Sequence, residues 1–235
     1  MTQRRFSAAG VVLLVVSAAA VLVAVVPVVR PASADAPRPT VWASRPPEPA
    51  VAHRFDVGYL SEPAGRLACG PVLVSYDPTG APASQGAPAG ALTAVLEASV
   101  RKWAAALGRP VVFTSDVAAA RADGVLVTIS WSEDLGGDVA GSASSVTASN
   151  GIDENPSILS GNVRLATGAR ATLNAHAGPG SWGETLEHEL GHVAGLDHAT
   201  AMGARMTTPA GSSWSYTAEE LAALAWVGDN PMCGA

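Results

Sequence analysis

Apolar residues recur along the chain in two spacings, and these spacings predict its helices and strands. Between residues 92 and 107 an apolar residue follows every three or four positions, as in an amphipathic helix, and Gly108 and Pro110 provide the stop. Short runs of mostly apolar residues are typical of buried strands instead. Such runs lie at 72–76, 111–113, 125–131 and 158–165.

Two further helices are predicted from the residues at their starts. Ser181 and Glu184 have the spacing of a capping box, in which each side chain bonds an amide at the helix start, and so do Thr217 and Glu220. An apolar stripe and a glycine stop follow in both cases. The order of strand, helix, strands, helix, loop and helix predicts an α/β sandwich.

The segment at 132–157 is polar and rich in Gly, Ser, Asp and Asn. Its most strand-like part is 139–146, for which an ordinary polar loop is the alternative. Oxygen ligands in the same segment suit calcium, and a solvated acidic loop is again the alternative. The candidate calcium ligands are Asp134, Asp138, Asp153, Glu154 and Asn155.

The first 34 residues have the pattern of a secretory signal peptide. Arg4 and Arg5 precede an apolar run at 8–29, and Ala32-Ser33-Ala34 forms a small-residue cleavage site, so cleavage is expected after Ala34. The apolar run is also long enough to span a bilayer, which leaves an uncleaved membrane anchor as the alternative. Either way the rest of the chain is expected outside the cytoplasm, secreted or held at the cell surface.

Composition narrows the function classes. With 48% hydrophobic and 14% charged residues, the chain is not a disordered tail. The net charge of −6, from 14 basic and 20 acidic residues, argues against a nucleic-acid partner. Residues 35–52 are rich in proline and predict a linker, which places a single folded domain at 53–235.

The two cysteines, Cys69 and Cys233, lie near the two ends of this domain. In an oxidising compartment they predict one disulfide that ties the C-terminus back to the start of the fold. A thiolate ligand to a metal is the alternative.

The segment from His188 to His198 carries the candidate chemistry. His188 and His192 are four residues apart, so both imidazoles leave one helix face and can meet one metal ion. Glu189 is placed to contact a metal-bound water. Gly195 can adopt a left-handed conformation that turns the chain and returns His198 as a third ligand. Three protein nitrogens leave one tetrahedral position for water, as in catalytic zinc sites.

This segment, with Met206 eight residues after His198, resembles the metzincin zinc metallopeptidases, and its spacing is most similar to the matrixin branch. The similarity is strongest over 182–209. The resemblance implies that the three histidines bind one catalytic zinc, that Glu189 is the general base and that Met206 forms a turn beneath the metal. It implies a zincin fold: a twisted, mostly parallel sheet with an antiparallel edge strand, an active-site helix and a C-terminal helix.

The chain departs from the matrixin pattern at several positions. Ala199 follows the third histidine where matrixins typically have serine, and Met206 leads into Thr207-Thr208-Pro209 instead of Met-x-Pro. No tyrosine follows Met206 by two residues, so the fifth ligand of astacin-like relatives is absent. Met202 follows His198 by only four residues, which is short for the turn.

Two other family features are weakly represented. His53 and His176 are too few for the second, structural zinc of vertebrate matrixins. Cys69-Gly70-Pro71 is similar to the cysteine switch, in which a propeptide thiolate blocks the zinc, and this is a second alternative to the disulfide.

The sequence therefore predicts a secreted, monomeric zinc endopeptidase that hydrolyses peptide bonds through a zinc-activated water, with Glu189 as base. A peptide substrate is expected along 139–146, and the loop at 207–216 is expected to line the pocket for the side chain after the cut bond. Asp197 is expected either to orient His198 or to be solvated, and His176 and Trp182 to be packing or surface residues. A zinc-containing binding or adhesion module without turnover, secreted or membrane-anchored, is the alternative. No nucleotide or redox cofactor is indicated.

Overall fold

The computed structural model describes ten stretches of the chain, all within the compact unit Ala36–Ala235. These stretches are 40–42, 60, 64–82, 90–114, 124–135, 139–149, 155–167, 181–200, 204–207 and 215–234. The predicted signal peptide at 1–34 lies outside them. Among the described helices, none has the length and apolar character needed to cross a membrane.

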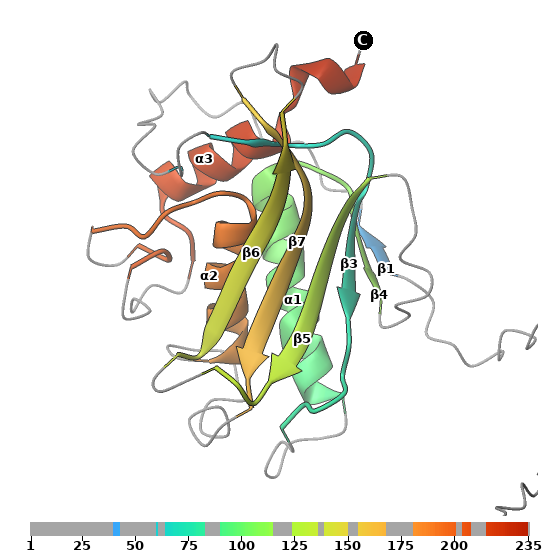
Figure 1. The fold of residues 1–235 in the computed structure, drawn as a ribbon, viewed down its shortest axis with the longest axis vertical. Coiled ribbons are helices and arrows are strands. Elements are labelled where there is room, and N and C mark those ends of the chain that lie inside the picture. The colour runs from blue at the N-terminus through green and yellow to red at the C-terminus, as the bar shows by residue number, and fades with distance from the viewer. Residues whose placement is uncertain are drawn as a thin grey trace, which may run out of the picture. The chain divides into compact units, whose positions relative to one another are not determined.

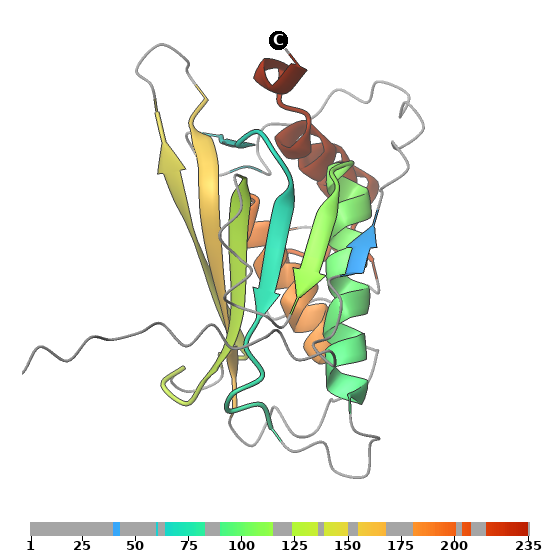
Figure 2. The same ribbon diagram turned by 90° about the vertical axis from the view of Figure 1, so that its right-hand side faces the viewer.

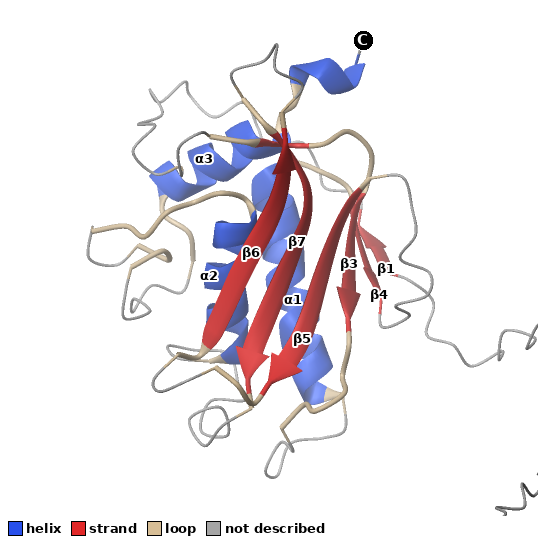
Figure 3. Ribbon diagram, viewed as in Figure 1, coloured by secondary structure: helices blue, strands red, loops and turns tan. Residues whose placement is uncertain are grey.

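The described residues form a mixed α/β fold around one seven-stranded, mostly parallel sheet (Figures 1 and 3). Strands β4, β3, β5, β7 and β2 are parallel to their neighbours, whereas β1 pairs antiparallel with β4 and β6 antiparallel with β7. The strands are β1 (Thr40–Trp42), β2 (Arg66–Leu67), β3 (Val72–Tyr76), β4 (Val111–Thr114), β5 (Val125–Ser132), β6 (Gly141–Ala148) and β7 (Ser157–Ala166).

The helices lie on one side of this sheet, as the turned view shows (Figure 2). They are α1 (Ala91–Leu107), α2 (Trp182–Val193) and α3 (Ala218–Gly228), followed by the short 3-10 helix η4 (Pro231–Gly234). The helix-facing side chains of β5, Val125, Val127 and Ile129, are fully buried beneath them. The apolar runs therefore supply the core that the sequence predicted for them.

Strand β6 confirms the strand predicted at 139–146, shifted by two residues. It pairs with β7 on the side away from β5 and β2, because Ser157 and Ile158 of β7 are paired by β2 and β6 at once. Most β6 side chains are exposed. Hence β6 forms one edge of the sheet in the described part of the chain.

The sheet also includes residues that the sequence assigned elsewhere. Thr40–Trp42 lies within the predicted linker at 35–52, yet it forms β1 against β4. Its triplet Thr-Val-Trp consists of residues that favour strands, and β4 offers an otherwise open edge. The two-residue strand β2 and helix η4 were also not predicted, because such short elements have no periodicity to detect.

The predicted disulfide is confirmed: Cys69 and Cys233 are bonded, with a Cα–Cα distance of 5.1 Å. Both sulfurs are therefore committed to the bond, and neither is a thiolate that could ligate a metal. Two arginines hold the same region by donating to carbonyl oxygens at the end of α3, Arg66 to Trp226 and Arg109 to Gly228. These contacts fix the C-terminal end of the chain against the start of the fold.

Removing the disulfide should destabilise the fold, because it closes a loop with a sequence separation of 164 residues. In the chain-entropy model we expect a loss of up to about 5 kcal/mol in the Cys69→Ser/Cys233→Ser variant, measured by urea unfolding. A reductant should lower the wild-type midpoint and leave that of the double variant unchanged. Equal unfolding midpoints for the wild type and the double variant in the absence of reductant would contradict the expectation.

Candidate metal centre

Helix α2 begins with half of the predicted capping box. The Ser181 hydroxyl accepts a hydrogen bond from the backbone N–H of Glu184 at 3.2 Å. The Glu184 carboxylate does not complete a box as predicted, because it lies 2.8 Å from the guanidinium of Arg205. The second box is confirmed in full at the start of α3, where Thr217 and Glu220 bond one another's backbone amides.

The turn after α2 forms as expected. Gly195 has φ of +83°, in the left-handed region where a side chain would be strained. The backbone N–H of Leu196 then bonds the carbonyl of Gly191 at 3.0 Å, which closes the turn. This reversal carries His198 back over the helix.

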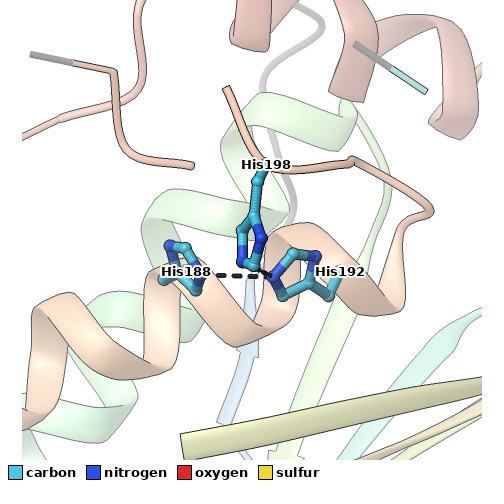
Figure 4. Close-up of side chains that lie close together, drawn as sticks. All are labelled: His188, His192 and His198. Atoms are coloured by element: carbon cyan, nitrogen blue, oxygen red, sulfur yellow. Dashed lines mark hydrogen bonds between the residues drawn. The ribbon is translucent and has the colours of Figure 1, made fainter. Parts of the chain in front are cut away.

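The three predicted histidines come together (Figure 4). His188 and His192 leave α2 on one face, and His198 reaches the same point from the chain that follows the turn. The Nε2 atom of His192 lies 3.1 Å from Nε2 of His188 and 3.1 Å from Nε2 of His198. One ligand atom from each ring lies within 4.8 Å of the others. The described residues therefore contain a cluster that could hold a metal ion.

In His188 and His192, the hydrogen bond at Nδ1 determines which ring nitrogen is unprotonated. Nδ1 of His188 lies 2.9 Å from the carbonyl oxygen of Arg205, and Nδ1 of His192 lies 2.7 Å from that of Leu196. Because a carbonyl oxygen only accepts hydrogen bonds, each Nδ1 must carry the proton. In both neutral rings Nε2 then presents a lone pair toward the cluster.

These lone pairs are the strongest evidence that the cluster suits a cation. Two unprotonated nitrogens 3.1 Å apart cannot hydrogen-bond to one another and repel unless a positive charge lies between them. Nitrogen ligands of a tetrahedral zinc ion, at about 2.05 Å from the metal, lie about 3.3 Å apart. The two spacings from His192 are close to that value, so the cluster could hold a metal ion.

Burial favours the neutral forms of His188 and His192. It lowers the pKa of His188 to about 4, against the hydrogen bond to the carbonyl of Arg205, which raises it. Burial also lowers the pKa of His192, against the hydrogen bond to the carbonyl of Leu196, which raises it. Metal ligands must be deprotonated, so the site is prepared for a metal at neutral pH without first losing protons from these two rings.

Glu189 lies beside these ligands and under the edge strand. Its side chain is buried at 6% exposure, and this burial raises its pKa to about 7. The carboxylate packs against Gly141 of β6, where a Cβ atom would lie 2.8 Å from Oε1. A side chain at position 141 would therefore force Glu189 to shift. Gly141 is thus a site residue that the sequence did not reveal, because its contact with Glu189 is distant along the chain.

Met206 connects helix α2 to the segment that contains His198. Its side chain is fully buried against Gly191 of α2, where a Cβ atom would lie 2.4 Å from the methionine sulfur. Its N–H donates to Glu220 at 2.7 Å, and its carbonyl accepts from the N–H of Ala199 at 2.9 Å. Met206 therefore joins the helix that carries two ligands to the segment that carries the third.

Other predicted residues have more limited outcomes. Trp182 is a packing residue, edge-on to Trp131 with ring centroids 4.9 Å apart. Asp197 makes a minor contribution that raises the pKa of His192, and its expected effect on His198 stays a prediction. Tyr216, at the end of the predicted pocket loop, is buried and donates its hydroxyl hydrogen to the carbonyl of Glu187.

Several predictions fall wholly or partly outside the described residues. Of the candidate calcium ligands, Asp134 and Asn155 are described, and Asp134 belongs to no group of three or more His, Cys, Asp or Glu ligands among the described residues. The residues outside them are Asp138, Asp153, Glu154, His53, His176, Met202 and 208–214 of the predicted pocket loop.

No family model and no curated protein matches this chain. Its mostly parallel sheet and its three-histidine cluster are compatible with a zincin.

Raising the pH should destabilise the metal-free protein through Glu189. Its carboxyl pKa rises from 4.5 to about 7 on folding, so the folded state favours the protonated form. The resulting stabilisation is complete below pH 4.5 and is lost as the pH rises through 7. Relative to Glu189→Gln, the wild type should lose up to about 3 kcal/mol between pH 4 and pH 8 in urea unfolding. If the free energies of unfolding of the two proteins changed by the same amount with pH, the raised pKa of Glu189 would be contradicted.

The contact between Gly191 and Met206 should appear as strong coupling. Gly191→Ala forces a Cβ atom into the methionine sulfur, and we expect a loss of about 1–3 kcal/mol. Met206→Ala removes the obstacle, so the double variant should be clearly more stable than the sum of the single effects predicts. A double-mutant cycle in urea measures this difference, and additive effects would show that the residues do not touch.

Proposed function

We propose that this protein is a zinc-dependent endopeptidase of the metzincin type, most similar to matrixins. The observation that carries the proposal is the convergence of three histidine rings at helix α2, which also carries the buried Glu189. Imidazole ligands suit several transition metals, and three of them with one open position are typical of catalytic zinc. A purely structural zinc site would instead fill all four positions with protein ligands.

In this proposal, His188, His192 and His198 hold the metal. Zinc, when bound, supplies the Lewis acidity that makes water a competent nucleophile and polarises a substrate carbonyl. Glu189 is the residue of this chain that moves the proton. Its carboxylate takes the proton from the water at an Oε atom and then delivers it to the departing amine, which conserves the proton over the reaction.

The environment of Glu189 supports both halves of this role. A pKa near the working pH allows one group to accept and then release a proton without a large energetic cost. Burial in the metal-free protein already brings the carboxyl into that range. Packing against Gly141 also restricts where the carboxylate can lie, so the proton acceptor is held close to the helix that carries two of the ligands.

The substrate we propose is an extended peptide that pairs with β6. One side of this strand is bonded to β7, and Gly141 at its start lies against Glu189. A peptide added to the other side would gain backbone hydrogen bonds and would pass the carboxylate. The exposed side chains of β6 are small or hydroxylated, apart from Val146, and leave the edge accessible.

We also propose that the protein is exported. The Cys69–Cys233 disulfide supports this, because such bonds persist in oxidising compartments. The pattern at residues 1–34 supports it independently. Mass spectrometry of the mature N-terminus would distinguish cleavage after Ala34 from an uncleaved anchor.

Hydrolysis of a mixed quenched-peptide library tests the activity. The zinc-loaded wild type should cut, and Glu189→Gln should retain one zinc per chain while losing at least a hundredfold in rate. Glu219→Gln, an exposed carboxylate on α3, is the matched control and should cut like the wild type. If wild type and Glu189→Gln both hold zinc and neither cuts, the protein is a binding module and the peptidase proposal is wrong.

A further inference from the structure

Arg205 is a buried cation whose side chain faces two buried carboxylates. Its side chain is only 2% exposed. One guanidinium nitrogen, Nη1, lies 2.8 Å from Oε1 of Glu184, and the other, Nη2, lies 3.1 Å from Oε2 of Glu187. Both glutamates belong to α2, within one turn before His188. The guanidinium therefore holds the segment of Arg205 directly to the helix that carries two metal ligands.

The backbone of Arg205 makes two further contacts. Its carbonyl oxygen accepts the Nδ1 proton of His188 at 2.9 Å, and its N–H donates to Oε2 of Glu220 on α3 at 3.1 Å. The guanidinium, the carbonyl and the N–H of Arg205 are thus all engaged, and they connect α2, α3 and His188. This arrangement goes beyond what the spacing of the motif reveals.

Charge makes the position of the guanidinium hard to change. The side chains of Glu184 and Glu187 are themselves only 4% and 2% exposed, so each depends on a nearby cation. Glu187 has a second one, because Nζ of Lys102 lies 2.8 Å from its Oε1. Removing one partner from a buried ion pair leaves an uncompensated charge, which is strongly unfavourable. Arg205 is therefore restrained from both its side chain and its main chain.

We propose that Arg205 is a positioning residue for the metal centre, resting on the proposed zinc function. Its guanidinium, clamped between Glu184 and Glu187, holds its own carbonyl where that oxygen accepts the Nδ1 proton of His188. This bond selects the tautomer and turns the Nε2 lone pair toward the other two histidines. Hydrogen-bond partners behind a metal ligand commonly change metal affinity by about ten- to a hundredfold.

Arg205→Lys is the first test variant, because it keeps the positive charge and loses the fork that meets two carboxylates at once. We expect its zinc affinity, measured by competition with a chelator, to fall about tenfold or more. Arg109→Lys is the matched control. Arg109 also binds backbone carbonyls through its guanidinium, but at the end of α3 and beside the disulfide. This control should lose stability and keep its zinc affinity.

A second measurement uses the metal-free protein. Long-range proton–nitrogen NMR correlations should show His188 as the Nδ1–H tautomer in the wild type and in Arg109→Lys, and as a tautomer mixture in Arg205→Lys. This readout tests Arg205 even if the wild type binds no zinc, an outcome that would overturn the proposed function instead. Arg205→Lys with wild-type zinc affinity and an unchanged His188 tautomer would show that Arg205 only supports the fold.

A triple variant separates charge from position. In Arg205→Met/Glu184→Gln/Glu187→Gln the buried carboxylates are neutral, so the uncompensated charge that could unfold Arg205→Met is removed. The triple variant should fold and still bind zinc about tenfold or more weakly, because no guanidinium helps to hold the carbonyl behind His188. Wild-type zinc affinity in the triple variant would overturn the proposal.

Discussion

Close approach to α2 is the constraint on which the site depends. Several contacts bring neighbouring segments nearer to this helix than ordinary side chains permit, and three of them lie near the site: Gly161 of β7 against Val193, Gly141 of β6 against Glu189, and Gly191 against Met206. A Cβ atom at any of the three glycines would lie within 3 Å of its neighbour. The helix is thereby fixed against the sheet, the edge strand and the segment that follows the ligands. That packing sets the positions of the histidines and of Glu189.

The same packing buries ionisable side chains of α2, and the fold provides specific partners for several of them. Ionisable residues line the helix, and burial disfavours their charged forms. His188 and His192 stay neutral and use their Nδ1 protons on backbone carbonyls. Glu184 and Glu187 stay paired with Arg205. The Nε2 lone pairs of His188 and His192 face one another beside His198, and this cluster could hold a cation.

The sequence predicted those parts of the structure that depend on local order. The ligand spacing, the turn at Gly195 and the capping residues lie within one short segment, and each follows from helix geometry. The longer parallel strands β3, β4, β5 and β7 followed from mostly apolar runs. Strand β1 was not predicted, because its pairing depends on an edge that lies far along the chain. Gly141 and Arg205 were missed for the same reason: their roles come from tertiary contacts. The capping box at Ser181 is incomplete for a related reason. Arg205, which is distant along the chain, pairs with the Glu184 carboxylate that the local pattern assigned to the helix start.

X-ray absorption spectroscopy at the zinc edge of the zinc-loaded protein tests the metal centre most directly. The account predicts one zinc per chain, surrounded by three imidazole nitrogens and one further light atom at about 2.0–2.1 Å, with no sulfur neighbour. The His192→Gln variant should lose this environment. A protein that takes up no stoichiometric zinc, or a zinc environment without three imidazoles, would contradict the account.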